Sequence, residues 1–589
     1  MEVNCGELRT TDEDKEVMLN GWCRYVRGHK DKIFIDLADR YGVTQIVFDS
    51  DKNKGAGELK REFVVRVHGC VMKREKDTID KSNPTGEIEV AVDEFSVINR
   101  SETPPFELIE EKEKFLANED IRLKYRYLDL RRKEMVDNIE FRDSVSKLMR
   151  KFFWRNGFLE LETPTLVRDT YETGSRTFLV PSRTRKGRFY SLPQSPQLYK
   201  QLCMVAGLDK YFQVCKAYRD EDAREDRQPE FTQIDMEISF EDEAYVQALI
   251  ESLFKKIFKE ILKKQPPKFH RMSYAEAVKD YGSDKPDLRY GYKIIDFTRE
   301  LKDCGYNVIT RVLQAGGKAK GVAFDAGFGG GKINRKYMLG IVEEAKSLGL
   351  KGLTWLFVEE GKLRSAPESI AESLGKAADE IVAKTKAKDG YVIIMGADLS
   401  ESVLDGVLGK LRKIVGDAIG RFSEEYAFVW VDEFPLFEQD EVTGKLKPSH
   451  NPFTAPMDNH IKMLETSPHT VLSRQFDLVL NGNEIGGGAV RINSDELQRK
   501  IFKIINVSER SVEKDFGFLL EALKYGAPED VGFALGFDRV LAVLKHNDNI
   551  RDFILFPKTK TFESPIDGSP SEISEKRLKD DYGLKKTLE

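Results

Sequence analysis

A polar hairpin is the feature that most constrains the fold of this 589-residue chain. Residues 212–221 and 230–240 are alternating runs joined by a connection rich in Asp, Glu and Arg, which is the pattern of two antiparallel strands. Strand side chains alternate between two faces. In the second run, one face holds Thr232, Ile234, Met236, Ile238 and Phe240, and the other holds Phe231, Gln233, Asp235 and Glu237. The sequence therefore predicts a sheet with an apolar core face and a polar face that carries one aromatic ring.

The polar face of this hairpin carries residues that are suited to bind a ligand. In the first run four residues share a face: Cys215, Ala217, Arg219 and Glu221. The small side chains leave room beside Arg219, whose planar guanidinium suits phosphate or carboxylate oxygens. Phe231 offers a flat ring to a base. A solvated hairpin whose charges keep the protein soluble is the alternative, but the ordered run RDEDAREDRQPEFTQID is too specific for it.

These residues resemble a known signature. The segment RDEDAREDRQPEFTQIDME is similar to the second signature motif of class II aminoacyl-tRNA synthetases, in the version of the bacterial-type aspartyl enzymes. GFLELETPTL resembles the first class II motif, which forms a dimer interface in that family. Gly536-Phe-Asp-Arg539 resembles the third motif. The resemblance covers nearly the whole chain and implies an α+β multidomain protein.

The resemblance also implies a domain organisation. We expect an OB-fold anticodon-binding β-barrel over 1–103, a hinge over 104–130, a catalytic domain with an antiparallel sheet over 131–290 and 422–557, an inserted α/β domain over 291–421, and a C-terminal extension over 558–589. The residues support the barrel independently, because five alternating runs separated by turn signals predict one. These runs are Val17–Val26, Lys32–Leu37, Thr44–Asp49, Phe63–Lys73 and Glu87–Ile98.

The predicted barrel carries an outward aromatic residue. Ile33, Ile35 and Leu37 point one way, which leaves Phe34 on the outer face, where an unpaired base can stack. Exposed aromatics and lysines are common, so this stretch alone leaves nucleic-acid binding open. In the family that the chain resembles, the OB-fold reads the tRNA anticodon. The positions that match its anticodon-contacting residues are Arg27, Phe34, Gln45, Arg74 and Glu89.

The resemblance places an L-aspartate site in the catalytic domain. The matching positions are Glu172, Ser195, Gln197, Lys200, Arg219, Gln233, Asp235, His450 and Arg491. A lysine that faces a substrate side chain calls for a negative charge, and Arg491 would join Lys200 in clamping a carboxylate. A neutral amide would leave both cations unpaired, so the pair favours aspartate over asparagine. For Lys200, an ordinary surface lysine is the alternative.

ATP and Mg²⁺ complete the implied site. The positions matched to ATP binding are Arg219, Asp220, Glu221, Gln228, Phe231, Glu484, Gly536, Phe537, Asp538 and Arg539. Arg219 is expected at the α-phosphate and Arg539 at the γ-phosphate. With Glu221 they form the expected catalytic set, which acts by positioning and charge neutralisation rather than as a nucleophile. Asp477 and Glu484 bracket a strand end and supply the hard oxygen ligands that Mg²⁺ prefers.

Composition limits the partners and the compartment. Charged residues make up 33 % of the chain but the net charge is −6, which argues against coating nucleic acid by bulk positive charge. Six cysteines without a C-x-x-C pair indicate reduced thiols and no zinc site. The amino terminus is polar and no apolar run is long enough to cross a bilayer. We expect a cytoplasmic homodimer that binds tRNA(Asp) and no membrane.

Departures from the family pattern keep two alternatives open. They lie in the loop Gly28–Lys32, in TYETGSRTF at 170–178, at Asn451 where the family usually has a second histidine, and at Pro528-Glu529-Asp530 where it has Pro-Pro-His. The unusual anticodon loop suggests a nondiscriminating enzyme that also charges tRNA(Asn). The departures at Thr173, Asn451 and Glu529-Asp530 suggest instead a nucleic-acid-binding or regulatory protein on an inactive synthetase scaffold.

Overall fold

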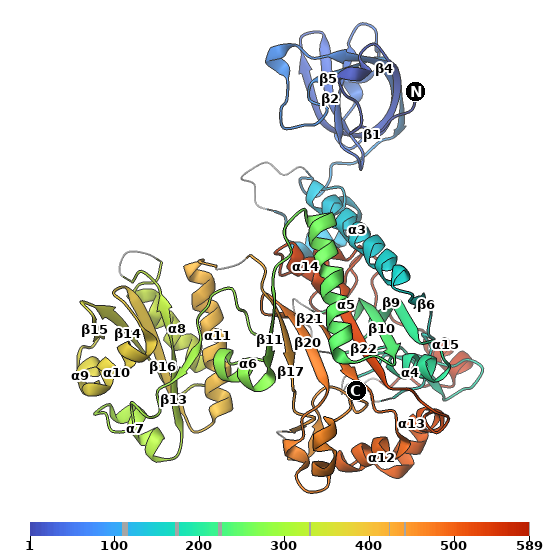
Figure 1. Cartoon of the computed structure of the whole chain (residues 1–589). Helices are drawn as coiled ribbons and strands as arrows, with labels where there is room; N and C mark the ends of the chain where they lie inside the picture. Colours follow the sequence, from blue (N-terminus) through green and yellow to red (C-terminus); the bar gives the residue numbers. More distant parts are fainter. Residues whose placement is uncertain are drawn as a thin grey trace. The chain divides into compact units, whose positions relative to one another are not determined.

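The computed structural model of the chain describes residues 1–108, 116–170, 176–221, 227–328, 332–422, 425–440 and 443–587. These residues form two compact units, Met1–Asp143 with Arg551–Glu572, and Ser144–Ile550 with Ile573–Glu589 (Figure 1). Each unit has a hydrophobic core of its own. Glu172 and Thr173, which the sequence places in a substrate-binding loop, lie outside the described residues.

The first unit contains a closed five-stranded barrel, as the sequence predicts. Its strands are β1 (Glu16–His29), β2 (Lys32–Ala38), β3 (Val43–Asp49), β4 (Val64–Lys73) and β5 (Ile88–Asn99), in the order β1-β2-β3-β5-β4. Ile35 and Leu37 are fully buried, whereas Phe34 between them is only partly covered. The expected alternation along β2 is therefore confirmed, with apolar residues inside the barrel and Phe34 on its outer surface.

The predicted hinge is helical where it is described. It holds α1 (Glu119–Lys124) and α2 (Arg126–Asp129). Arg126 is 1 % exposed, and its Nη1 donates to Asp129 Oδ2 at 2.6 Å. Its Nη2 donates to the backbone carbonyl of Arg551 at 2.8 Å, which ties this segment to the distant part of the same unit. Buried, paired arginines hold these helices together, so this part of the segment is a packed element rather than an open linker.

The second unit is built on an eight-stranded sheet with the order β11-β17-β20-β21-β22-β10-β9-β6. The strands are β6 (Leu159–Glu160), β9 (Lys210–Tyr218), β10 (Glu230–Ser239), β11 (Phe269–Ser273), β17 (Phe428–Asp432), β20 (Gln475–Leu480), β21 (Asn483–Val490) and β22 (Asp530–Gly536). Inner neighbours are antiparallel, and the two outermost pairs, β6 with β9 and β11 with β17, are parallel. The predicted antiparallel catalytic sheet is present.

The predicted hairpin forms the centre of this sheet. β9 and β10 pair with Cys215 opposite Gln233 and Ala217 opposite Phe231, so these four side chains share a face. On the other face of β10, Ile234 is buried in the core. The division into an apolar and a polar face therefore follows the period of two residues.

Two details of the hairpin prediction are wrong. β9 spans Lys210–Tyr218 rather than 212–221, because the backbone of Arg219 already closes the connection by donating to the Pro229 carbonyl at 2.9 Å. Phe240 was expected on the apolar face, but it lies beyond β10 with φ +65° and is 77 % exposed. A residue that leaves the extended backbone no longer follows the alternation of the strand.

Helices cover the catalytic sheet. They are α3 (Lys133–Arg155), α4 (Gln197–Val205), α5 (Glu243–Lys256), α12 (Asp495–Ile504), α13 (Glu509–Leu523) and α14 (Phe537–Leu544). α3 and α5 lie side by side in Figure 1, with Lys256 Nζ 5.5 Å from the ring centroid of Phe152. Phe153 of α3 stacks on Phe212 of β9 with ring centroids 4.9 Å apart. α3 ends two residues before Gly157, whose φ is +82°.

A separate sheet lies between β11 and β17 in the sequence. Its strands are β12 (Ile294–Asp296), β13 (Lys318–Asp325), β14 (Leu353–Glu359), β15 (Lys362–Arg364) and β16 (Tyr391–Asp398), in the order β12-β13-β16-β14-β15. The helices of this region are α6 (Tyr274–Tyr281), α7 (Asn307–Gln314), α8 (Arg335–Ser347), α9 (Ser369–Leu374), α10 (Lys376–Thr385) and α11 (Glu401–Ile419). Ile394 and Ile393 of β16 enter different hydrophobic clusters, so helices pack on both faces.

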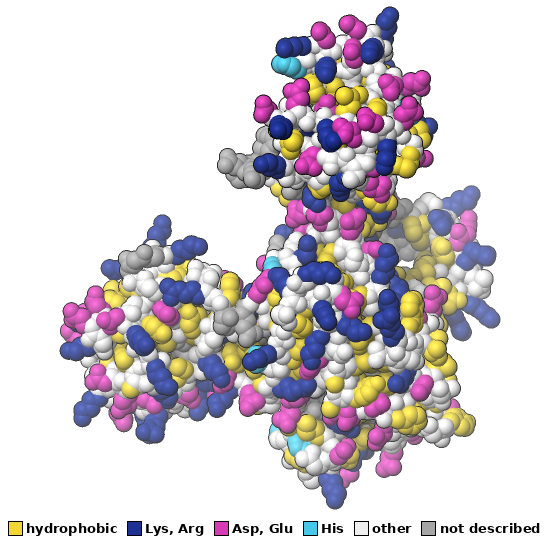
Figure 2. Space-filling model, turned by 45° about the horizontal axis from the view of Figure 1, so that its top comes forward, with side chains coloured by type: hydrophobic (Ala, Val, Ile, Leu, Met, Phe, Trp, Pro, Cys, Tyr) yellow, Lys and Arg dark blue, Asp and Glu magenta, His cyan; other side chains and the backbone are white. Residues whose placement is uncertain are grey.

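Short elements complete the described chain. They are the hairpins β7 (Leu179–Pro181) with β8 (Phe189–Ser191) and β18 (Phe437–Gln439) with β19 (Leu446–Pro448), and α15 (Glu575–Arg577) in the predicted C-terminal extension. Acidic and basic side chains are interspersed on the face drawn in Figure 2. In the described ranges, none of the helices is both long enough and apolar enough to span a bilayer.

Candidate active site

The polar face of β10 carries the amino-acid half of the predicted site. Lys200 extends from α4, and its Nζ lies 2.7 Å from Asp235 Oδ1 and 2.8 Å from Glu237 Oε2. Arg491 follows β21 and places its Nε 2.9 Å from Glu237 Oε1. Each of these four side chains is at most 2 % exposed. The two predicted cations therefore meet at one buried carboxylate, and the surface-lysine alternative for Lys200 does not hold.

Burial and ion pairing act in opposite directions on these two carboxyl groups. Loss of hydration raises the pKa of Asp235, and the charge of Lys200 only partly offsets this effect. Loss of hydration acts on Glu237 as well, but there Arg491 and Lys200 together outweigh it and lower the pKa. Glu237 is therefore the anion that holds the two cations in place.

Several buried polar atoms in the described part of the second unit have no hydrogen-bond partner, and three of them belong to predicted site residues. Among the described residues, buried side-chain atoms without a hydrogen-bond partner include Arg219 Nε, Gln233 Oε1, Ser449 Oγ, Gln475 Oε1 and Arg491 Nη1. Leaving such an atom unpaired costs about 1–3 kcal/mol, so a group of them marks the place of a polar ligand. Although Arg491 is paired with Glu237 through Nε, its Nη1 remains available for a substrate carboxylate.

His450 is subject to charges from both predicted halves of the site, the amino-acid half and the nucleotide half. Its side chain is still accessible to water, yet desolvation and the charge of Arg491 lower its pKa to about 4. Arg219 and Lys200 act in the same direction, and Glu484 opposes them. The imidazole is therefore neutral at neutral pH. The four charged residues that act on His450 belong to the predicted aspartate site and to the predicted ATP site. The two predicted sites therefore adjoin at His450.

The residues predicted to bind the nucleotide include Arg219 and its neighbours. Its guanidinium carbon lies 5.2 Å from the ring centroid of Phe231. Arg539 Nη1 donates to the backbone carbonyl of Glu484 at 3.0 Å. Arg219 is subject to the negative charges of Glu221 and Glu484 and to the positive charge of Arg539. The three residues of the expected catalytic set thus lie near one another.

Other predicted site residues contact protein groups next to the site. Asp538 accepts a hydrogen bond from the Thr232 backbone N–H at 2.8 Å and so fixes the first turn of α14 against β10. Phe537 is 2 % exposed and lies in the core. Gln197 Nε2 donates to Gln201 Oε1 at 3.2 Å. We interpret these side chains as positioning their neighbours, because protein groups already occupy them.

The remaining predicted residues lie at the ends of elements. Ser195 Oγ accepts from the backbone N–H of Gln197 at 3.3 Å, just before α4. Gln228 is buried near the end of the connection between β9 and β10, whereas Asp220 is exposed near its start. Gly536 caps the N-terminus of α14. All of them belong to the second unit.

Asp477 and Glu484 flank a glycine on the sheet. A β-carbon built on Gly487 would lie 2.6 Å from Asp477 Oδ1 and 3.9 Å from Glu484 Oε1, so both carboxylates border the same small space. Burial and the charge of Glu484 raise the pKa of Asp477 well above its ordinary value. Lys285 Nζ lies 2.9 Å from Glu484 Oε2, and its charge outweighs burial and lowers the pKa of Glu484.

This carboxylate pair fits a divalent cation. Two hard oxygen donors beside a space bounded by glycine are a typical partial ligand set for Mg²⁺, which fills its remaining positions with water and phosphate oxygens. In the part of the chain that the structure describes, no group of three or more His, Cys, Asp or Glu side chains could hold a metal alone. A metal at this pair would therefore depend on ligands from a bound phosphate.

The five residues predicted to contact an anticodon lie together on the barrel. Arg27 Nη2 lies 3.1 Å from Asp36 Oδ1 and 3.4 Å from Gln45 Oε1. Gln45 Nε2 donates to Glu89 Oε2 at 2.7 Å. Phe34 is directly opposite Arg27 across β1 and β2. Desolvation lowers the pKa of Arg74, and Glu89 and Asp36 oppose this shift, which places Arg74 in the same network.

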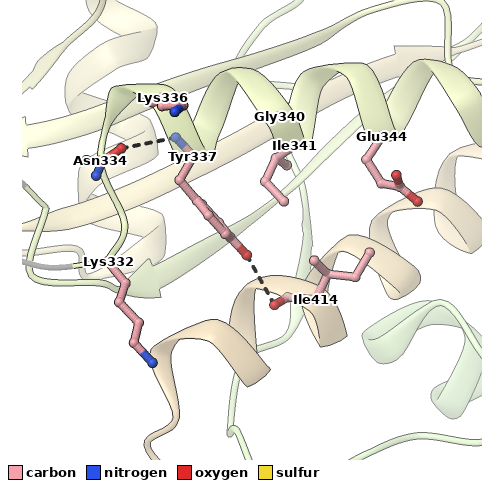
Figure 3. A pocket seen from close by; sticks show the side chains of 8 residues that line it. All are labelled: Lys332, Asn334, Lys336, Tyr337, Gly340, Ile341, Glu344 and Ile414. Carbon is pink, nitrogen blue, oxygen red and sulfur yellow. Dashed lines mark hydrogen bonds between the residues drawn. The ribbon is translucent and has the colours of Figure 1, made fainter. Parts of the chain in front are cut away.

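A cavity of about 630 Å³ lies apart from these residues, between α8 and α11. Tyr337 points across it and donates its hydroxyl to the Ile414 carbonyl at 3.3 Å (Figure 3). Asn334 caps α8 by accepting from the Tyr337 backbone N–H at 3.1 Å. None of the predicted site residues lines this cavity.

Comparison with protein families accounts for both units. Residues 118–560 match the family described as tRNA synthetases class II (D, K and N). Residues 17–98 match the OB-fold nucleic acid binding domain. This chain belongs to the class II tRNA synthetases. The predicted fold class is thereby confirmed: an OB-fold barrel precedes a class II synthetase sheet.

This synthetase is similar to curated proteins along almost its whole length. A protein of Halothermothrix orenii is 44 % identical over 581 residues, and one of Aquifex aeolicus is 42 % identical over 595 residues. Both are named aspartate–tRNA(Asp/Asn) ligase. A protein of Macrococcus caseolyticus, named aspartate–tRNA ligase, is 41 % identical over 582 residues. Each alignment covers 98 % of this chain and 97 % of the relative.

Solved structures share the fold of this synthetase at low identity. Asparaginyl-tRNA synthetase from Pyrococcus horikoshii aligns with a TM-score of 0.59 and 19 % identity, over 95 % of this chain and 98 % of the other. Aspartyl-tRNA synthetase from Entamoeba histolytica aligns with a TM-score of 0.56 and 18 % identity, over 95 % and 91 %. These likenesses support the fold alone.

Three residues, Glu237, Lys285 and Asp530, were not assigned a role in the synthetase site from the sequence. Glu237 was placed on the polar face, but its pairing with both cations depends on Arg491, which is distant in the sequence. Lys285 lies in YGSDKPDLRYG, where nothing local indicates its contact with Glu484. Asp530 was noted only as a departure from the family pattern. A buried acidic residue at the start of a strand was the available signal.

Proposed function

We propose that this synthetase is an aspartate–tRNA ligase. It would activate L-aspartate with ATP to aspartyl-adenylate and transfer the aspartyl group to the 3′ end of tRNA(Asp), with release of AMP and diphosphate. The observation that carries the proposal is the buried pocket in which Lys200 and Arg491 meet at Glu237, together with His450, whose pKa is lowered by desolvation and by the charges of Arg491, Arg219 and Lys200. An anion-binding pocket beside an arginine that suits a phosphate is what this reaction needs. The names of the curated relatives support the choice of aspartate.

The first half-reaction follows from charge and position. Aspartate would place its side-chain carboxylate at Arg491 Nη1 and near Lys200, and its α-carboxylate would attack the α-phosphate of ATP in line. Arg219 would neutralise the charge that develops there, and Arg539 would hold the triphosphate tail. No side chain forms a covalent intermediate, since orientation and electrostatic stabilisation supply the rate.

Mg²⁺ is proposed as a companion of ATP. Asp477 and Glu484 would hold it, and the ion would supply charge neutralisation of the phosphates. Lys285 balances the charge of Glu484. Chelation should abolish activity, and Asp477→Asn should raise the Mg²⁺ concentration needed for half-maximal activity. Activity that persists in excess chelator would contradict this part of the proposal.

Exchange of pyrophosphate into ATP tests the main proposal. We expect exchange that depends on aspartate and is much weaker with asparagine, because an amide leaves the buried cations unpaired. Absence of exchange with any amino acid would favour the alternative of an inactive, nucleic-acid-binding scaffold.

Charging of tRNA(Asn) is a second candidate activity. Relatives named for both tRNA(Asp) and tRNA(Asn) favour it, as does the unusual loop Gly28–Lys32, in which Lys30 adopts φ +50°. Aminoacylation of each purified tRNA with aspartate separates the two cases. If only tRNA(Asp) accepts aspartate, the enzyme is discriminating.

A homodimer is proposed from the first class II motif. Leu159 of β6 is 48 % exposed and Leu166 is 51 % exposed, so the predicted interface segment at 157–166 presents large apolar side chains. Sedimentation equilibrium should give twice the chain mass of 67.4 kDa. A monomer at micromolar concentration would contradict the proposal.

A further inference from the structure

Asp530 lies directly beside the buried cations of the site. It is the first residue of β22 and is 4 % exposed. In the pairing of β10 with β22, Ser239 is opposite Asp530 and Glu237 is opposite Gly532. Glu237 and Asp530 are therefore diagonal neighbours on one face of the sheet, a spacing that long side chains can bridge.

The two carboxyl groups lack enough donors. Among the described residues, Asp530 Oδ2 and Glu237 Oε2 are both buried without a hydrogen-bond partner. Lys200 Nζ lies 2.8 Å from Glu237 Oε2 and supplies that oxygen with a positive charge, so Asp530 Oδ2 is the oxygen for which no nearby donor is found among the described residues. The strand register brings the carboxyl groups of Glu237 and Asp530 to the same part of one sheet face, and both of these residues are buried. One proton shared between two buried acceptors satisfies both of them.

We propose that Asp530 is a positioning residue for aspartate binding, which carries a proton and donates it as a hydrogen bond to Glu237. The inference rests on the proposed function, since it specifies how the same pocket is kept ready for an anionic substrate. Asp530 acts through Glu237, which in turn holds Lys200 and Arg491.

The charges around Asp530 support this assignment. Glu237 faces it from β10, Lys200 from α4, and Arg491 from the end of β21, and Asp235 pairs with the same Lys200. With Asp530 neutral, two cations balance two carboxylates. Ionised Asp530 would add a third negative charge to a pocket that must accept a substrate with two carboxylates. Burial, followed by the charge of Glu237, raises the pKa of Asp530 well above its ordinary value.

Two substitutions separate the roles of charge and hydrogen bonding. Asp530→Asn stays neutral and keeps a donor, whereas Asp530→Ala removes the donor and leaves Glu237 Oε2 with Lys200 alone. In aspartate-dependent pyrophosphate exchange at pH 7.5, we expect the KM for aspartate to change by less than about threefold in D530N and to rise by about tenfold or more in D530A, with a smaller change in kcat. Glu529→Gln removes the exposed neighbouring charge and is the matched control, with no change expected.

The result that overturns the proposal is equal damage in D530N and D530A, or no effect of D530A. A second measurement detects the protonated carboxyl group of Asp530 directly. The infrared difference spectrum of wild type against D530N at pH 7.5 should contain the carbonyl band of a protonated carboxylic acid, and its absence would also overturn the proposal. If wild type shows no exchange, the proposed function fails, while the infrared band still decides whether Asp530 carries the proton.

Discussion

Glu237 and Arg491 form a 2.9 Å ion pair that crosses β22 at Gly532. A β-carbon built on Gly532 would lie 1.9 Å from Glu237 Oε2 and 2.2 Å from Arg491 Nη2. No side chain fits at this position without displacing one member of the pair. The arrangement of the aspartate pocket therefore depends on a glycine that contacts no substrate.

Gly532→Ala should impair aspartate use more than ATP use. The added methyl group pushes Arg491 away from Glu237, so we expect the kcat/KM for aspartate to fall by about tenfold or more, because a buried charge pair is disturbed. Gly406→Ala in α11 is the control, since a β-carbon there meets no atom within 4 Å. Exchange kinetics at varied aspartate measure the effect. Equal kinetics for the two variants would contradict the argument.

Lys200→Met should destabilise the second unit and abolish aspartate activation. The variant leaves Asp235 and Glu237 with fewer partners in a buried site, and breaking a buried ion pair costs about 3–5 kcal/mol. We expect a clearly lower midpoint of thermal unfolding. Lys216→Met on the exposed side of β9 is a matched control that should change the stability by less than about 0.5 kcal/mol. A wild-type midpoint for K200M would show that the cluster contributes no stability.

Asn451 is explained by its hydrogen bonds. Its Oδ1 accepts from the Phe453 backbone N–H at 3.0 Å and from Thr454 Oγ1 at 3.2 Å, and the side chain is 8 % exposed. Asn451→Ala should therefore destabilise the protein by about 1–3 kcal/mol. Asn451→His should destabilise it less, because Nδ1 of a neutral histidine can accept from the same position. The midpoints of thermal unfolding rank the variants, and an unchanged midpoint for N451A would refute this role.

Asp432 should make stability depend on pH. Burial, followed by the charge of Glu433, raises the pKa of Asp432 to about 6. Between about pH 4 and 6 the folded state binds more protons at this residue than the unfolded state, so its contribution to stability falls as the pH rises. Asp432→Asn removes this penalty. We expect it to raise the unfolding midpoint by about 2 °C or more at pH 7 but not at pH 4.

The exposed neighbour provides a graded control for that experiment. Glu433→Gln removes only the second cause of the shift, so it should raise the midpoint at pH 7 by a smaller amount. If D432N changes the midpoint equally at pH 4 and pH 7, ionisation of Asp432 is not responsible.

Phe34→Ala should weaken tRNA use without affecting the activation of aspartate. Loss of base stacking costs about 1–3 kcal/mol, so the KM for tRNA should rise by about tenfold. Phe34 belongs to the first unit and the candidate active site to the second, so pyrophosphate exchange should be unchanged. Tyr41→Ala is the control, since Tyr41 is an exposed barrel aromatic that stacks with Arg40. Equal losses in both variants would remove the specific role of Phe34.

Much of the fold was predictable because local patterns were strong. The alternation of Ile35 and Leu37 placed Phe34 outside the barrel, and the signature around Arg219 placed the hairpin in a known family. The ends of elements were less accurate, as at Phe240. Whether a backbone leaves the extended conformation depends on its tertiary neighbours, which a period of two residues does not encode.

Most residues of the candidate site could be proposed from the sequence, but the ion pairs between them could not. Lys200 and Arg491 were expected to be free for substrate, whereas Glu237 already engages both. That contact joins three segments far apart in the sequence, so only the fold reveals it. The same holds for Lys285, whose role depends on Glu484. Asn451 shows the converse, because a departure from a family pattern can have a local structural explanation.

The connection from β11 to β17 has a consequence for engineering. These adjacent parallel strands are in register from Phe269 opposite Phe428 to Ser273 opposite Asp432. Parallel neighbours need a crossover of only a dozen or so residues, usually one helix. Residues 274–427 are therefore, in topological terms, one oversized crossover, and their described part contributes no strand to the catalytic sheet. A much shorter helical bridge would preserve the strand order, provided that it kept Lys285 in its contact with Glu484, so the rest of this segment is a natural place to exchange modules.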